Sequence, residues 1–93
     1  MKDMQADRAL TEAEREFAAL LTASLPPVIA RKEVGRFLGG LLAKKTMANL
    51  DDAGQGPEVA YKVGRSVVYR TDELVGWLVR RFGVERMVNI RNF

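Results

Sequence analysis

The stretch of residues 41–78 constrains the fold more than any other part of this sequence. It begins with a short helical pattern whose first turn carries two lysines, and a Gly-rich turn follows. Two alternating segments of the kind that form a β-hairpin come next, with an arginine at the turn and another at the end. A well-capped amphipathic helical pattern closes the stretch. This order predicts a basic helix start and a basic hairpin that lie side by side.

The composition limits the chain to one small domain and excludes several kinds of chemistry. The 93 residues, with 47% apolar and 29% charged side chains, suffice for one modest core. The sequence contains no cysteine and no histidine. Disulfides, thiolate catalysis, the usual zinc sites and histidine acid–base chemistry are therefore excluded. We expect no cofactor and no metal.

Two features of the sequence bear on where the protein resides. No segment is apolar over the roughly 18 residues that a membrane span requires. The N-terminal stretch also lacks the apolar region of a signal peptide. We therefore expect a cytoplasmic protein with no membrane partner.

The net charge of +3 is distributed unevenly along the chain. Residues 1–24 carry three basic and five acidic side chains, a net charge of −2. Residues 25–93 carry twelve basic and seven acidic side chains, a net charge of +5. A basic domain suits a polyanionic partner such as nucleic acid. An ordinary solvated basic surface is the alternative.

Residues 1–25 are predicted to form an N-terminal helical extension. Thr11 and Glu14 have the spacing of a capping box, and Pro26 and Pro27 end the helix near Ser24. One face carries Ala13, Phe17, Leu20, Leu21 and Ser24. This face would either cover the core of the following domain or pair with a second copy to form a homodimer, and the sequence leaves both open.

Two helical patterns joined by a glycine turn predict a helix-turn-helix unit. The first spans residues 31–38 and ends at Gly39 and Gly40. The second spans roughly residues 43–53, and its apolar positions predict that Ala43, Met47 and Leu50 are buried.

The charges of this second helix oppose its dipole. Lys44 and Lys45 lie at the positive end, and Asp51 and Asp52 lie at the negative end. Each placement forgoes about 0.3–1 kcal/mol at an exposed site. Cations at the helix start would suit phosphates or base edges, and a merely suboptimal helix is the alternative.

Residues 58–70 alternate in polarity and predict a β-hairpin. We favour a three-residue loop, in which Val63 pairs with Val67 and Tyr69 lies on the face of Tyr61. It places Arg65 at the tip, with Lys62, Val68 and Arg70 on the outer face. A two-residue turn of Gly64 and Arg65 would move Tyr69 to the opposite face.

Residues 71–82 predict the last helix. Thr71 is expected to cap it with its hydroxyl group, with Asp72 and Glu73 in the first turn. Trp77 is expected in the core, and Gly83 ends the helix. Residues 26–83 are thus predicted to form one domain, followed by a tail, residues 84–93, to which the sequence assigns no structure. The whole pattern predicts a mainly α fold with a small β-hairpin.

The combined pattern resembles the small MerR-superfamily winged helix-turn-helix proteins, especially the AlpA-type regulators and the phage excisionases. The resemblance covers residues 28–82 and rests most on residues 46–50, 54–57, 63–65, 69–70 and 72–78. It implies a winged helix-turn-helix for these residues. The amphipathic helix expected at residues 11–24 precedes this unit and lies outside the family's usual core pattern. This chain departs from the pattern at residues 39–42, which are longer than the usual turn and offer no side-chain cap.

By this resemblance, the second helix enters the major groove of DNA, and the hairpin is a wing against the backbone. Lysine and arginine can contact phosphate or guanine, and asparagine can pair with adenine. The expected DNA-binding residues are Lys44, Lys45, Thr46, Asn49, Lys62, Arg65, Arg70 and Arg31.

The resemblance implies sequence-specific binding of double-stranded DNA. The protein would be a small transcriptional regulator, or an excisionase-type architectural factor of a prophage or mobile element with a recombinase as partner. A protein–protein adaptor on the same fold and a DNA-packaging protein like a phage terminase small subunit stay open as alternatives. Because the carboxylates are scattered and form no opposed acid–base pair, we expect no enzymatic activity.

Overall fold

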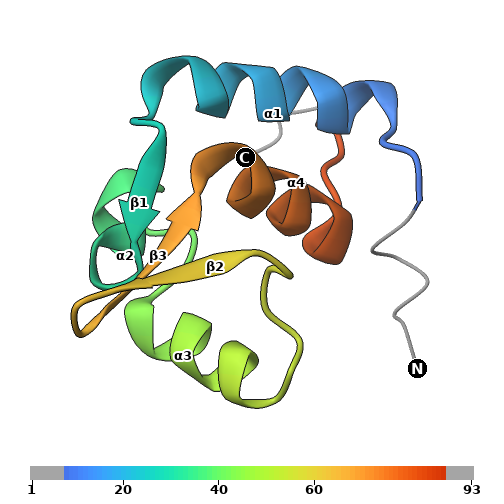
Figure 1. Cartoon of the computed structure of the whole chain (residues 1–93). Helices are drawn as coiled ribbons and strands as arrows, with labels where there is room; N and C mark the ends of the chain where they lie inside the picture. Colours follow the sequence, from blue (N-terminus) through green and yellow to red (C-terminus); the bar gives the residue numbers. More distant parts are fainter. Residues whose placement is uncertain (1–7, 88–93) are drawn as a thin grey trace.

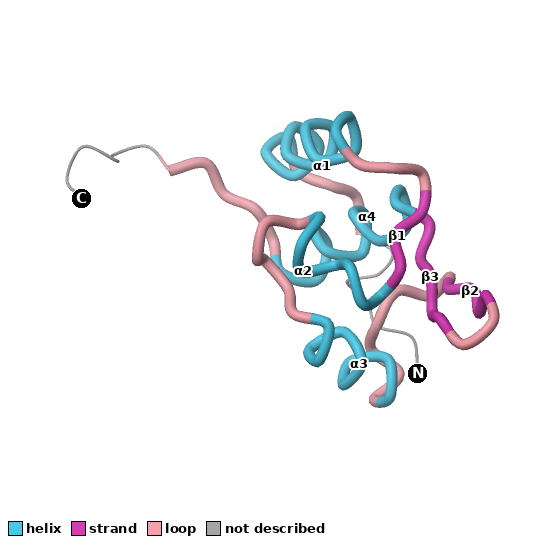
Figure 2. The backbone as a smooth tube through the Cα atoms, turned by 90° about the vertical axis from the view of Figure 1, so that its left-hand side faces the viewer, coloured by secondary structure: helices cyan, strands magenta, loops and turns pink. Residues whose placement is uncertain are grey.

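The computed structural model describes residues 8–87, which form a mixed α/β fold. Within this range, four α-helices accompany one three-stranded antiparallel sheet. The elements are α1 (Glu12–Ser24), β1 (Val28–Ala30), the 3-10 turn η2 (Arg31–Glu33), α2 (Val34–Phe37), α3 (Lys44–Asp52), β2 (Ala60–Val63), β3 (Ser66–Arg70) and α4 (Thr71–Phe82). Helices α1 and α3 lie at opposite ends of the molecule in both views (Figure 1; Figure 2).

The capping box at the start of α1 is confirmed. The Glu14 amide donates to the Thr11 hydroxyl over 3.2 Å, and the Thr11 amide donates to the Glu14 carboxylate over 2.9 Å. The helix ends at Ser24, as the following prolines predict. It contacts α4, while Leu20 is 70% exposed. A role in covering the domain is thus observed, and pairing with a second copy stays a prediction.

A partly buried ion pair fixes the start of α1 to the end of α4. Arg8 Nη1 and Nη2 donate to the two oxygens of Glu14 over 2.7 and 2.8 Å. Arg8 Nη2 also donates to the carbonyl groups of Val79 and Arg80. The guanidinium group thus adds hydrogen bonds to two carbonyls near the C-terminal end of α4, where intrahelical donors run out.

The sheet has one strand more than the predicted hairpin. Strand β1 pairs with β3 in the order β1-β3-β2, and Ile29 lies opposite Tyr69. Both side chains are almost fully buried. The sequence patterns predicted no strand at Val28–Ala30. A strand of three residues is too short for its alternation to be recognised.

The predicted register of the hairpin is wrong. Val63 pairs with Ser66, so the turn has two residues, Gly64 and Arg65. Gly64 has a φ of 62°, and a glycine at the first central position is the preference of a type II′ turn. Tyr69 is therefore buried on the core face, whereas Tyr61 is exposed on the other face. Strand β2 is an edge strand with every residue exposed. The alternation of polar and apolar residues in its sequence therefore does not correspond to alternating burial.

This register also changes the predicted outer face. Lys62 lies opposite Val67, on the face that Tyr69 shares. It was expected beside Val68 and Arg70, which lie on the other face. A shift of one residue in register moves every side chain of a strand to the opposite face.

The glycine turn between the two short helices is confirmed. Gly39 and Gly40 have φ values of 62° and 87°, which glycine adopts without steric cost. Met47 is buried as predicted, but Ala43 is exposed and Leu50 is only half-buried. Leu42 is buried instead of Ala43, because the helix begins one residue later, at Lys44.

The predicted hydroxyl cap of α4 is wrong. Thr71 is the first residue of the helix, and its hydroxyl group donates to the carbonyl of Pro26. The residue before the helix is Arg70, which provides no side-chain cap. Asp72 and Glu73 lie in the first turn, as predicted.

The core lies between α4, the sheet and the short helices. Trp77 is partly buried and packs against it. The buried members of the core are Ile29, Val34, Leu38, Leu42, Met47, Tyr69, Leu74 and Leu78. No helix between residues 8 and 87 is long and apolar enough to cross a membrane.

Candidate nucleic-acid interface

A groove of about 510 Å³ lies between the start of α3, η2 and the turn of the hairpin. It is lined by Arg31, Lys32, Lys44, Lys45, Ala48, Arg65, Ser66 and Val67. Five of these eight residues are lysine or arginine, and none is acidic. We call this surface the basic groove. Side chains of one charge that converge on a concave surface raise the local potential for an anionic partner.

The start of α3 adds backbone groups to this positive charge. The helix begins at Lys44, and the preceding Ala43 offers no side-chain hydrogen bond to the free amides. No acidic residue lies in the first turn. The positive end of the helix dipole, the free N–H groups and the two lysines therefore act in the same direction. This arrangement favours an anion such as phosphate.

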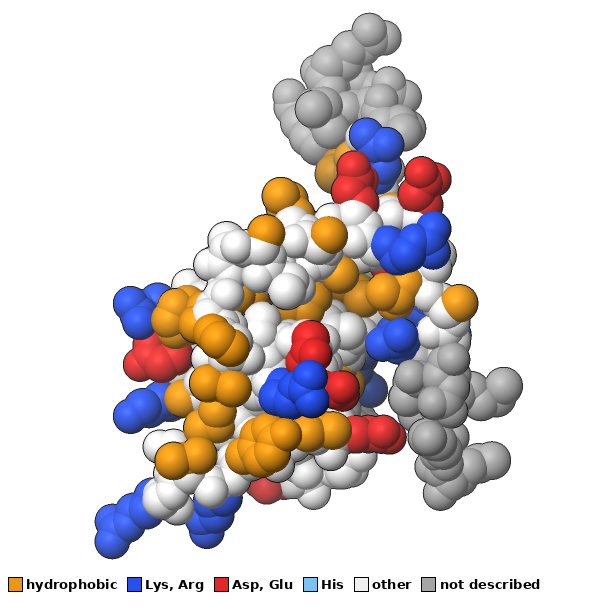
Figure 3. Space-filling view, turned by 45° about the horizontal axis from the view of Figure 1, so that its top comes forward, with side chains coloured by type: hydrophobic (Ala, Val, Ile, Leu, Met, Phe, Trp, Pro, Cys, Tyr) orange, Lys and Arg blue, Asp and Glu red, His pale blue; other side chains and the backbone are white. Residues whose placement is uncertain are grey.

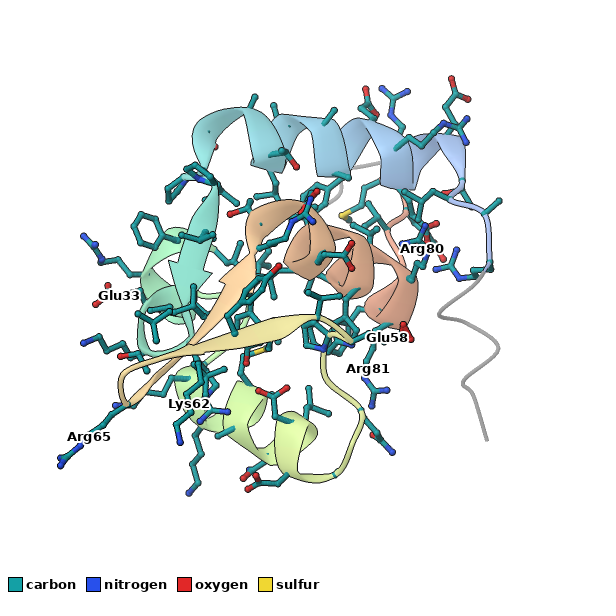
Figure 4. The ribbon with its side chains drawn as sticks, viewed as in Figure 1. Glu33, Glu58, Lys62, Arg65, Arg80 and Arg81 are labelled. Atoms are coloured by element: carbon teal, nitrogen blue, oxygen red, sulfur yellow. The ribbon has the colours of Figure 1, made fainter. Side chains whose placement is uncertain are left out.

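The hairpin supplies the opposite side of the groove. Arg65 is exposed on the two-residue turn and points away from the body of the molecule (Figure 4). Lys62 extends from β2 toward α3 in the same view. It does not line the groove, but it lies on the same sheet face as Val67, which does.

Arg31 lines the groove, yet its charge is already matched. Its Nη1 atom lies 3.0 Å from Oδ2 of Asp51, in the last turn of α3. The same oxygen accepts a hydrogen bond of 2.5 Å from the hydroxyl group of Tyr69. Burial, together with this hydrogen bond to a carboxylate, raises the pKa of Tyr69 well above its ordinary value. The tyrosine is therefore a neutral donor at physiological pH.

The other predicted site residues lie outside the groove lining. Thr46 and Asn49 are exposed on α3. Arg70 lies on the other face of the sheet, and its Nη2 atom pairs with Asp72 over 2.7 Å. Of the eight predicted residues, the groove therefore brings together Arg31, Lys44, Lys45 and Arg65.

Lys32 lines the groove and was missing from the predicted residues. Lys32 follows Arg31 directly, and this pair of adjacent cations was the sequence feature from which its role could have been predicted. The sequence pattern predicted a regular helix from residue 31, whereas residues 31–33 form a 3-10 turn. Because a 3-10 turn has three residues per turn, side-chain directions differ from those in an α-helix.

The loop that leaves α3 is held by α4. The indole N–H of Trp77 donates to the Gln55 carbonyl over 3.0 Å. Nη2 of Arg81 donates to the Gln55 side-chain oxygen, also over 3.0 Å. Both ends of the α3 segment are thus fixed, by buried Leu42 before it and by these hydrogen bonds after it. The groove is built from elements that the core holds in place.

Within residues 8–87, no group of three or more Asp and Glu side chains lies close enough to hold a metal ion. Comparison of the chain with models of protein families, with curated proteins and with solved structures found no match in any of the three.

Proposed function

We propose that this protein binds double-stranded DNA through the basic groove as a winged helix-turn-helix. The short helices α2 and α3 are the helix-turn-helix, and the β2–β3 hairpin is the wing. The observation that carries the proposal is the convergence of lysine and arginine side chains from η2, α3 and the hairpin turn on one groove without an acidic lining residue. The protein binds its ligand without catalysing a reaction on it.

The lining of the groove favours a duplex over a single strand. Single-stranded nucleic acid is held by aromatic side chains on which bases stack. No aromatic residue lines the basic groove, and Tyr61 lies on the opposite face of the sheet. A helix-turn-helix binds a duplex through cations that contact the backbone and a helix whose first turns reach base edges in the major groove. Helix α3 and its lysines supply both.

The biological role follows from the resemblance rather than from the groove. A small transcriptional regulator and an excisionase-type architectural factor of a mobile element both require sequence-specific duplex binding. A DNA-packaging role requires a duplex as well. The groove supports the binding step that these roles share.

The proposal is tested by the salt dependence of duplex binding. A labelled duplex of about 20 base pairs, titrated by fluorescence anisotropy between about 50 and 200 mM salt, reports the number of phosphates contacted. About five contacts, from Lys32, Lys44, Lys45, Lys62 and Arg65, predict a log–log slope of about −4.5. No binding at about 50 mM salt, or a slope near zero, contradicts the proposal.

A matched pair of variants separates the basic groove from net charge. The double variant Lys44→Gln/Lys45→Gln removes two charges from the groove and should flatten the slope by about two units. The control Arg15→Gln/Arg86→Gln removes two charges from α1 and the segment after α4, both outside the groove. Equal effects of the two variants would show that net charge alone governs binding.

One observation favours the adaptor as a second candidate. The outer face of the sheet exposes Val28, Tyr61 and Val63, which are 49%, 48% and 63% accessible. Hydrophobic side chains reach the surface in broad groups between the charged ones (Figure 3). Exposed apolar patches of this kind mark protein–protein contacts. The variant Tyr61→Lys/Val63→Lys should retain duplex binding if the basic groove is the working site. If the outer face of the sheet is the working site, the variant should lose binding to the partner protein.

A further inference from the structure

The carboxylate of Asp51 joins three elements, one of which carries the groove-lining Arg31. It belongs to the last turn of α3, and its Oδ2 atom accepts from Arg31 in η2 and from Tyr69 in β3. The Asp51 side chain is only 20% exposed, and Tyr69 is fully buried. A charge-assisted hydrogen bond from each neighbour holds the carboxylate in one position.

The loop after α3 approaches the second oxygen of Asp51 closely at Gly56. A Cβ atom added at Gly56 would lie 1.9 Å from Asp51 Oδ1, so the loop backbone lies directly against the carboxylate. An acid at the C-terminal end of a helix opposes the helix dipole, so helix stability does not explain its presence. The contacts of Asp51 with η2, β3 and the loop explain why an acid stands at this position.

We infer that Asp51 is a positioning residue of the DNA interface, which sets the distance between α3 and the wing and removes the charge of Arg31 from the phosphate contacts. The inference rests on the proposed function. Because Asp51 is bonded to β3, the start of α3 and the hairpin turn meet a duplex with a fixed spacing. Arg31 lines the groove, but its positive charge pairs with Asp51 within the protein.

Two variants with the same change of charge test this role. Asp51→Asn removes the carboxylate and frees Arg31, so the salt slope for a random duplex should become steeper by about one unit. Discrimination between a duplex selected by the parent protein from a randomised pool and a scrambled duplex should fall by about tenfold, the loss expected from one base contact. Asp52→Asn, at the exposed neighbouring residue, should leave discrimination unchanged. Equal discrimination by the two variants overturns the inference.

Arg31→Met tests the same point without changing Asp51. If Arg31 acts within the protein, this variant lowers discrimination while the salt slope stays within about half a unit of the parent value. A slope that falls by about one unit with unchanged discrimination would show that Arg31 contacts phosphate, and the inference would be wrong.

Hydrogen exchange gives a reading that requires no DNA. The amides of α3 should exchange faster in Asp51→Asn than in Asp52→Asn, while the amides of α4 are unaffected in both. If the parent protein binds no duplex, the proposed function and this inference fail together. If the parent binds but the two variants behave alike, only the inference fails.

Discussion

The indole N–H of Trp77 donates to the carbonyl oxygen of Gln55 over 3.0 Å, which joins α4 to the loop that leaves α3. The ring also packs against the core and meets Phe82 edge-on, with ring centroids 5.9 Å apart. A single side chain thus belongs both to the core and to the support of the proposed recognition helix. Replacing the Trp77 side chain should therefore lower the stability of the fold, and any effect on DNA binding should follow from that loss of stability.

Trp77→Ala should lower the free energy of unfolding by about 3 kcal/mol, the lower end of the range for large aromatic truncations, because the ring is only partly buried. Trp77→Phe retains much of the ring contact and loses the hydrogen bond, so it should lower this free energy by about 1 kcal/mol. Urea unfolding of the parent and the two variants provides the measurement. A Trp77→Ala variant that is as stable as the parent but binds no duplex would show that Trp77 is a binding residue.

The ion pair of Arg8 with Glu14 predicts a stability change at low pH. The Arg8 guanidinium and the Thr11 amide lower the pKa of Glu14 from 4.5 to about 2. Because the folded-state pKa is depressed, the stabilisation is fully present above pH 4.5 and is lost as the pH falls through about 2. Thermal melting between about pH 5 and 2 should show this loss.

Two variants assign the loss to Glu14. Glu14→Gln should remove most of the pH dependence in this window, because the neutral amide has no proton to gain. Glu12→Gln changes an exposed acid of the same helical turn and should leave the dependence in place. A Glu14→Gln profile that coincides with the parent profile would mean that other carboxylates govern the acid transition.

Gly56 and Asp51 are predicted to be energetically coupled. A methyl group at residue 56 would overlap the Asp51 carboxylate, so Gly56→Ala should destabilise the fold by about 1–3 kcal/mol. Asp51→Ala removes the obstructing carboxylate. In that background the same Gly56→Ala change should have a much smaller effect, and the double-mutant cycle should give a coupling energy of about 1 kcal/mol or more. Strictly additive effects would mean that Gly56 acts through its own backbone.

Local rules predicted the features that depend on neighbouring residues. The capping box of Thr11 and Glu14 and the glycine turn at Gly39 involve residues at most a few positions apart. Each was correctly predicted, because the relevant energy is set by a single turn of backbone. The lysines at the start of α3 were placed correctly for the same reason.

The errors involve contacts between distant residues. The Thr71 hydroxyl was expected to cap α4, but it donates to the carbonyl of Pro26, 45 residues earlier. The hairpin register depends on burying Tyr69 against Ile29, which lies in a strand that the sequence did not reveal. Asp51 opposes its own helix dipole because of partners 18 and 20 residues away. Tertiary contacts of this kind outweigh local preferences.

Asn49 on α3 and Arg65 on the wing represent the two elements that are proposed to face DNA. Asn49 is exposed on α3, about one turn beyond Lys45, where a helix inserted in the major groove presents side chains to base edges. Asn49→Ala should therefore relax the preference at one base pair, with a loss of about 1–3 kcal/mol on the best duplex and little loss on others. Selection from a randomised pool with each protein provides the measurement.

Arg65 should behave differently, because it projects from the two-residue turn of the wing. Arg65→Ala should weaken binding to all duplexes about equally and flatten the salt slope by about one unit, as the loss of one phosphate contact requires. The absence of a side-chain cap at Ala43 leaves α3 dependent on its tertiary contacts for its orientation, so the Asn49 effect should disappear in the Asp51→Asn background while the Arg65 effect persists. The reverse pattern, with uniform weakening from Asn49→Ala and altered preference from Arg65→Ala, would mean that the wing reads the sequence and the helix holds the backbone.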